Sequence, residues 1–128
     1  MKKIILTNLI IMAFIVCGNV SAGEKDHASK DWQIKAYSSA APSFIGKYAT
    51  IIGGSGKVIR KGSNGWTCQS GNSRPFPKGG WKNVHEAMPT CHDIQAMNWM
   101  MAYSNGTTPK LDTDGWMWML HGDVGEDN

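Results

Sequence analysis

The feature that most constrains this chain is a pair of cysteines, Cys68 and Cys91, at the two ends of a segment without hydrophobic periodicity. Residues 69–88 are rich in glycine, proline, serine and asparagine, which predicts an irregular loop. A loop of about 20 residues in a small domain is usually functional or disordered unless its ends are held. We therefore expect a Cys68–Cys91 disulfide. A redox or nucleophilic Cys91 is the alternative, because its expected place in the first turn of a helix favours a thiolate.

The first 22 residues have the pattern of a secretory signal peptide. Two lysines precede an almost unbroken apolar run over residues 4–16, and small residues at 20–22 mark a cleavage site. A single membrane span is one alternative, but the run is shorter than the ~20 residues that cross a bilayer. A lipid-modified Cys17 is another, which the bulky residue before it disfavours. We expect a secreted or periplasmic bacterial protein with no stable membrane insertion after leader cleavage.

The mature chain, residues 23–128, is long enough for one modest domain. Removal of Lys2 and Lys3 leaves eleven basic residues against ten acidic ones, a net charge of about +1 without any basic block. This balance argues against nucleic acid or an anionic membrane as the main partner. Six tryptophans are many for this length. They predict either a small core filled with large side chains or an aromatic binding face.

Two helices are predicted. Ser29 can cap a helix that runs to about residue 40, and Pro42 stops it. Residues 90–93 fit a capping box, so a second helix should begin at Thr90 and run to about residue 103. Two apolar stripes along this second helix predict that it is largely buried.

Short strand-like runs at 48–52, 57–60 and from residue 66 are separated by glycine-rich turns, which predicts an antiparallel meander. Residues 115–121 are apolar on both faces and predict a central strand covered on two sides. The expected fold is α+β, with a small antiparallel sheet of about four strands, two packed helices and one disulfide. Because little follows the last strand to cover it, we also expect that a C-terminal part of the domain is missing.

An ordered set of segments carries a family resemblance. The segments are SSAAPSFIGKYATII, GKVIRKGSNGWTC, MPTCHD, NWMMAY and WMWMLHGDVGEDN. Together they resemble an uncharacterised family of small secreted bacterial proteins with SAAP, NGWTC, MPxCxD and YMLxGD-type segments. The match covers residues 36–128; Trp118 stands where the family tends to have tyrosine. The resemblance implies a longer chain and implies no activity.

Histidines and carboxylates form the best set of candidate metal ligands. Zinc or copper needs about three or four such groups that converge. The spacing matches no metal motif, and ordinary surface residues are the competing interpretation. The candidate ligands are His85, His92, His121 and Asp123. The acidic residues at 112–114 resemble part of a calcium loop, but Lys110 stands where a first aspartate is required.

The 69–88 loop carries a second candidate site. Trp81 follows two glycines, so we expect its ring to be exposed and able to stack on a sugar or an apolar ligand. His85 and Glu86 would add polar contacts to that ligand. The tryptophans in predicted strands are more simply interpreted as core.

No nucleophile motif, phosphate loop or readable pair of catalytic carboxylates is present in the sequence. We rank a non-catalytic extracytoplasmic binding or accessory protein first and a structural or interaction protein second. A metal-dependent enzyme built from the four candidate ligands ranks third. The sequence identifies no cofactor and no partner.

Overall fold

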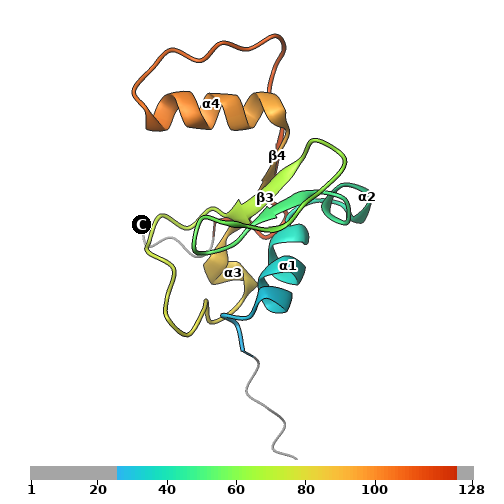
Figure 1. Ribbon diagram of the computed structural model, residues 1–128, viewed down its shortest axis with the longest axis vertical. Helices are drawn as coiled ribbons and strands as arrows, with labels where there is room; N and C mark the ends of the chain where they lie inside the picture. Colours follow the sequence, from blue (N-terminus) through green and yellow to red (C-terminus); the bar gives the residue numbers. More distant parts are fainter. Residues whose placement is uncertain (1–25, 124–128) are drawn as a thin grey trace, which may run out of the picture.

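A five-stranded sheet forms the centre of the fold. The computed structural model describes residues 26–123, so the predicted leader and Cys17 lie outside the described residues. The strands are β1 (Thr50–Ile52), β2 (Val58–Arg60), β3 (Thr67–Ser70), β4 (Pro89–His92) and β5 (Met117–Trp118). The helices are α1 (Lys30–Ser38), α2 (Ser43–Gly46), α3 (Val84–Ala87) and α4 (Ile94–Ser104). The strand order is β2-β1-β3-β4-β5, and the fold is α+β as predicted (Figure 1).

The sheet is mixed, whereas the sequence predicts an antiparallel sheet of about four strands. β1 and β2 form an antiparallel hairpin, but β1 and β3 run parallel. The cause is the 61–66 connection, which crosses the start of β1, where Gly62 N donates a hydrogen bond to Thr50 Oγ1 (3.0 Å). β3 therefore joins β1 on the side opposite β2. A Cβ on Gly62 would lie 2.2 Å from the Thr50 nitrogen, so this crossing requires glycine.

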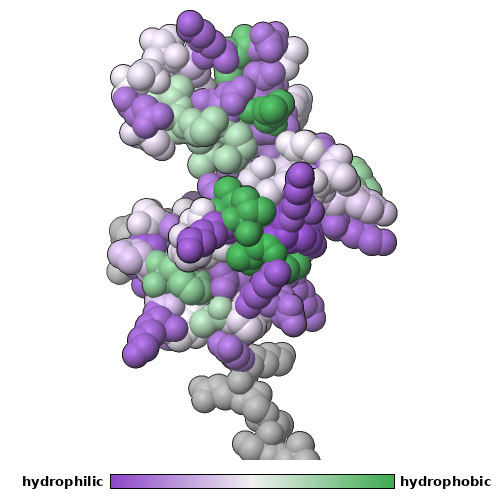
Figure 2. Space-filling model, viewed as in Figure 1, coloured by the Kyte–Doolittle hydropathy of each residue, from purple (hydrophilic) through white to green (hydrophobic). Residues whose placement is uncertain are grey.

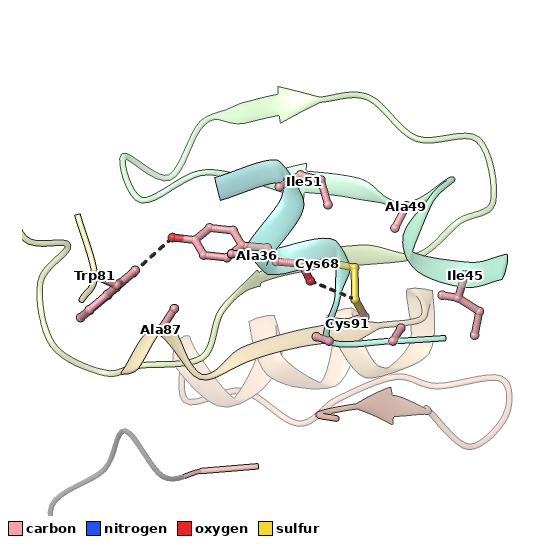
Figure 3. Packing of buried hydrophobic residues seen from close by; sticks show 11 residues of the cluster. Ala36, Ile45, Ala49, Ile51, Cys68, Trp81, Ala87 and Cys91 are labelled. Atoms are coloured by element: carbon pink, nitrogen blue, oxygen red, sulfur yellow. Dashed lines mark hydrogen bonds between the residues drawn. A yellow bond between two sulfur atoms is a disulfide. The ribbon is translucent and has the colours of Figure 1, made fainter. Parts of the chain in front are cut away.

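Helix α1 covers one face of the sheet and buries Gln33, Ala36 and Tyr37 against it. Ser29 Oγ accepts a hydrogen bond from Trp32 N (3.2 Å) and caps the helix as predicted. Ala36 lies on the inner side of the helix, next to the Cys68–Cys91 bridge (Figure 3). The buried cluster consists of Ala36, Tyr37, Ala40, Ala41, Ile45, Ala49, Ile51, Cys68, Trp81, Ala87 and Cys91.

The predicted disulfide joins Cys68 on β3 to Cys91 on β4 (Figure 3). The two residues lie directly opposite each other in the antiparallel register, and both are fully buried. The Cys91 sulfur also lies 3.7 Å from the Tyr37 carbonyl oxygen on α1. Cys91 is therefore a structural half-cystine, and the bridge holds both ends of the 69–88 segment at the centre of the core.

Residues 89–92 form strand β4, whereas the sequence predicts a helix that begins at Thr90. β4 pairs with β3 along its whole length, and all of its residues are buried. The helix begins after the strand, with Asp93 as its N-cap: Asp93 Oδ1 accepts a hydrogen bond from Ala96 N (2.8 Å). Pairing with β3 thus overrides the local helix signal at Thr90.

Helix α4 and the segment that follows it, residues 94–116, form a projection that we call the α4 arm. None of the residues of α4 is buried, so the prediction of a largely buried second helix is wrong. Figures 1 and 2 show the α4 arm as an upper lobe that stands away from the rest of the fold. Apolar stripes that the sequence assigns to a core therefore lie partly on the surface.

β5 is an edge strand of two residues, and the prediction of a central strand over 115–121 is wrong. Both of its side chains, Met117 and Trp118, are exposed. After β5 the chain leaves the sheet, because Leu120 N donates a hydrogen bond to Ala40 O (3.0 Å) at the end of α1. The apolar composition of this segment reflects a surface feature rather than burial on two sides.

Candidate functional site

The 69–88 segment is held together by its own polar groups. The Glu86 carboxylate accepts a hydrogen bond from Lys82 N (2.6 Å) and forms an ion pair with Arg74 (3.1 Å). Asn72 Nδ2 donates to the Glu86 carbonyl oxygen (2.7 Å). The hydrogen bond from Lys82 N is the main cause that lowers the pKa of Glu86, and the Arg74 guanidinium adds to it. Glu86 is thus engaged in fixing the loop.

Trp81 is buried, whereas the sequence predicts an exposed ring. Its side chain is 1% exposed, and its indole N–H donates a hydrogen bond to the Tyr37 hydroxyl (3.2 Å). The Trp81 carbonyl accepts a hydrogen bond from His27 Nδ1 (2.6 Å), and the Arg74 guanidinium lies 5.6 Å from its ring centre. Trp81 therefore anchors the loop to α1, and it offers no face on which a ligand could stack.

Two of the four predicted metal ligands meet. The rings of His85 and His121 contact edge to face, with centres 5.4 Å apart. Within residues 26–123, however, no group of three or more histidine, cysteine, aspartate or glutamate side chains could hold a metal ion. His92 and Asp123 do not complete such a group with the ring pair. The described residues thus give no support to a metal centre, since two imidazoles fall short of the usual three or four ligands.

The His85–His121 pair also touches a serine. Ser39 Oγ lies 2.8 Å from His121 Nε2 and 2.7 Å from the Ala36 carbonyl oxygen. The carbonyl can only accept, so the Ser39 hydroxyl donates to it and accepts from His121 Nε2–H. In this arrangement the histidine does not withdraw a proton from the serine. The contact therefore ties the chain after β5 to the end of α1 and does not activate a nucleophile.

A hollow with one unpaired polar atom among its lining residues lies between α4 and β5. It has a volume of about 350 Å³, close to the lower end for small-molecule sites. Met117 stands directly opposite His92 in the strand register, so their side chains share the face of the sheet that α1 does not cover. The lining residues are His92, Ala96, Trp99, Met100, Leu111, Gly115 and Met117. We call this hollow the α4 cavity.

Among the described residues, His92 is the one titratable side chain in the wall of the α4 cavity. It is 3% exposed, and its Nδ1 atom is buried without a hydrogen-bond partner among the described residues. Burial lowers the pKa of His92 below its ordinary value of 6.5, and the Asp93 charge opposes this to a smaller extent. The ring is therefore neutral at pH 7. A buried polar atom without a partner costs about 1–3 kcal/mol, so native proteins rarely keep one.

Asp93 positions both walls of the α4 cavity. One carboxylate oxygen caps α4 at Ala96 N, and the other accepts a hydrogen bond from Trp116 N (3.0 Å) just before β5. Asp93 N in turn donates to Trp116 O (3.0 Å). A Cβ on Gly115 would lie 2.5 Å from Ala96 N, so the return of the chain to α4 also depends on glycine. The sequence assigns Asp93 to a helix cap, but gives no sign of its second contact.

Two other hollows lie on the side of α1. One, of about 420 Å³, is bordered by His27 and Trp32, whose rings stack 4.5 Å apart. The other, of about 210 Å³, lies between Arg74 and the glycine turn at 53–56. In both hollows the main polar side chain already has a partner, since His27 bonds to a carbonyl and Arg74 pairs with Glu86. The unpaired atom of His92 distinguishes the α4 cavity from both.

No family model, characterised protein or solved structure matches this chain. No helix within the described part, residues 26–123, is long and apolar enough to cross a membrane. The case for a function therefore rests on the geometry of the chain itself, and within that geometry on the α4 cavity.

Proposed function

We propose that this chain is an extracytoplasmic, non-catalytic binding protein, and that the α4 cavity holds its ligand. The observation that carries the proposal is the unpaired, buried Nδ1 of His92. The unpaired nitrogen lowers the stability of the fold, and we expect that a leucine of similar size would avoid this loss. Because Nδ1 is itself buried, a ligand in the α4 cavity would recover that free energy by turning the His92 ring so that the unpaired nitrogen faces it.

The lining restricts the chemistry of the ligand. Apart from the His92 ring, the side chains around the α4 cavity are apolar or aromatic, which favours a mostly apolar body. The imidazole is neutral at pH 7, because burial lowers the pKa of His92, and it gives no charge to pair with an anion. We therefore expect a compact neutral molecule with one hydrogen-bonding group, such as a phenol, an indole or an aryl amine.

The location outside the cytoplasm is part of the proposal. It is supported by the leader pattern in residues 1–22 and by the Cys68–Cys91 disulfide, which is typical of oxidising compartments. The resemblance to small secreted bacterial proteins points the same way. The 69–88 loop, which the sequence favours as the site, takes a supporting role in this proposal because its polar groups bind one another.

Fluorescence titration tests the proposal with two matched probes on the chain from residue 23. The neutral aryl amine N-phenyl-1-naphthylamine should bind, and its sulfonated analogue 8-anilinonaphthalene-1-sulfonate should bind at least about tenfold more weakly, a difference of about 1.4 kcal/mol. His92→Leu and Leu111→Trp should each weaken the neutral probe by about tenfold or more, through loss of the polar anchor and loss of volume. His85→Leu, an exposed histidine outside the cavity, is the matched control.

Urea unfolding of the same variants separates a binding role from a structural one. His92→Leu should be at least as stable as the parent chain, because it removes a buried polar atom without a partner. A variant that binds less yet unfolds no earlier supports the proposal. Equal affinity of the neutral probe for all four proteins would show that the α4 cavity is not the site.

A further inference from the structure

The two edges of the sheet differ in charge. β2 forms one edge and β5 the other. The β2 edge carries Lys57, Arg60 and Lys61, and charged side chains on an edge strand disfavour pairing with another chain. Residues 116–120 on the β5 edge carry no charge at all. Within residues 26–123, the β5 edge therefore has none of the charged side chains that usually protect an edge against strand addition.

The backbone of β5 has hydrogen-bonding groups that point outward. Antiparallel pairs alternate between those that exchange hydrogen bonds and those that do not. Asp93 N donates to Trp116 O, so Trp116 belongs to a bonded pair with β4. Met117, the next residue, faces His92 in a non-bonded pair. Its N–H and C=O are therefore directed away from β4, where a further strand would lie.

Exposed apolar side chains surround this edge. Trp99 stacks on Tyr103 with ring centres 5.4 Å apart and lines the α4 cavity together with Met117, whereas Trp118, opposite Cys91 in the register, lies on the other face of the strand. The exposed fractions are 48% for Trp99, 74% for Tyr103, 68% for Trp116, 53% for Met117, 37% for Trp118 and 57% for Leu120. We call these six residues the β5 patch.

The area of the β5 patch matches what a dimer needs. Side chains of this size each bury up to roughly 150–250 Å² when fully covered. At the exposed fractions above, the six residues present on the order of 700 Å² of mainly apolar surface. A standard stable interface buries about 800 Å² on each partner, including its polar rim. One copy of the β5 patch, with a few polar neighbours, is thus enough for one side of such an interface.

We propose that two copies of this chain associate through the β5 patch, with the two β5 strands antiparallel across a two-fold axis. An antiparallel edge strand can pair with its own copy, so the same patch serves both protomers and the assembly closes as a dimer. The two sheets then form one continuous sheet, and the tryptophans of each copy cover those of the other. This proposal does not depend on the ligand of the α4 cavity.

Light scattering and sedimentation of the chain from residue 23 measure its molar mass in solution and so test the proposal. Protein concentrations from about 1 to about 100 µM include the micromolar dissociation constants of the weakest interfaces of this size. We expect twice the chain mass at the upper concentrations. Trp116→Lys places a charge on the edge and Leu120→Lys places one just after it; neither residue lines the α4 cavity, and each variant should weaken the dimer by about 100-fold or more. Phe44→Lys, at an equally exposed aromatic residue on α2 (72%), should leave the dimer intact.

The molar mass of the parent chain tests the proposal even if a variant fails to fold. A monomer throughout the concentration range overturns the proposal, and so does an open series of larger assemblies. Dissociation by Phe44→Lys to the same extent as by Trp116→Lys would also overturn it. If monomeric Trp116→Lys binds N-phenyl-1-naphthylamine with unchanged affinity, ligand binding in the α4 cavity does not require the dimer.

Discussion

Removal of the Cys68–Cys91 bridge should cost this protein a large part of its stability. The perturbation is the double variant Cys68→Ala and Cys91→Ala. Alanine is preferable to serine, because both positions are fully buried and a hydroxyl there would lack an assured partner. The two strands keep their register in this variant, so only the covalent constraint and two sulfur atoms are lost.

The magnitude follows from the length of the closed loop. The cysteines are 23 residues apart in the chain. In the chain-entropy model, closing a loop of this length restricts the unfolded state by about 3.4 kcal/mol at 25 °C. A domain of about 100 residues has a total unfolding free energy of roughly 5–15 kcal/mol, and its midpoint shifts by about 4–8 °C per kcal/mol. We therefore expect a loss of about 3 kcal/mol and a fall in melting temperature of roughly 15 °C.

Urea unfolding followed by tryptophan fluorescence measures this loss. Trp81 is a suitable reporter because it lies in the core and its indole bonds to Tyr37. The control is the parent chain with its disulfide reduced, which should lose a similar free energy with both sulfur atoms present. If the double variant and the reduced parent chain lose the same unfolding free energy, the loss comes from the covalent constraint and not from the change of side chain.

A small effect would refute this reasoning. If both the double variant and the reduced parent lose less than about 1 kcal/mol, loop closure is not what the bridge contributes. The hydrogen bonds around Glu86 would then hold the 69–88 segment in its place without the covalent link. The entropic role assigned to the two cysteines would be wrong, although the fold would be unchanged.

Three further predictions concern single residues. Burial lowers the pKa of His92 from 6.5, so the unfolded chain gains a proton at a higher pH than the folded chain does. The unfolding free energy should therefore fall as the pH drops below about 6.5. Urea titrations at several pH values measure this slope, and His92→Leu should remove the part that His92 contributes. Gln33 donates to Ala28 O (2.7 Å) and accepts from Gly54 N (2.7 Å), so Gln33→Met, of similar shape, should lose about 1–3 kcal/mol in urea unfolding. A Cβ on Gly54 would lie 2.2 Å from the Phe76 ring. Gly54→Ala should therefore lower the unfolding free energy by about 1–3 kcal/mol and change the near-UV circular dichroism. Gly79→Ala is the control and should do neither, because a Cβ on Gly79 would have open space around it.

The parts of the fold that the sequence predicts correctly depend on neighbours in the chain. The cap at Ser29 defines the start of α1, and glycine-rich turns separate β1, β2 and β3. The Cys68–Cys91 bridge follows from the two cysteines that remain after the predicted leader. Each of these signals acts over a few residues or through a simple count. They are sufficient for the α+β class and for the β1–β2 hairpin, but not for the parallel pairing of β3 with β1.

The errors arise where distant segments decide the outcome. Residues 89–92 resemble a helix start, but pairing with β3 makes them a strand. Residues 115–121 have the composition of a buried strand, yet most of that apolar surface stays on the outside. His92 was a candidate ligand from its residue type alone. Its burial depends on α4, on Leu111 and on Met117, and nothing local to residue 92 reveals these contacts.

The two faces of the sheet contain different kinds of residue. On the face under α1, buried groups are apolar or paired: Trp81 bonds to Tyr37, and the cysteines bond to each other. On the face toward α4, a buried histidine atom has no partner among the described residues, and the half-exposed Trp99 ring lies in the same cavity wall. Features of the second kind lower the stability or solubility of a lone monomer. Because the first face already supplies a core and a covalent bridge, the second face can retain such features, and binding is the process that would compensate for them.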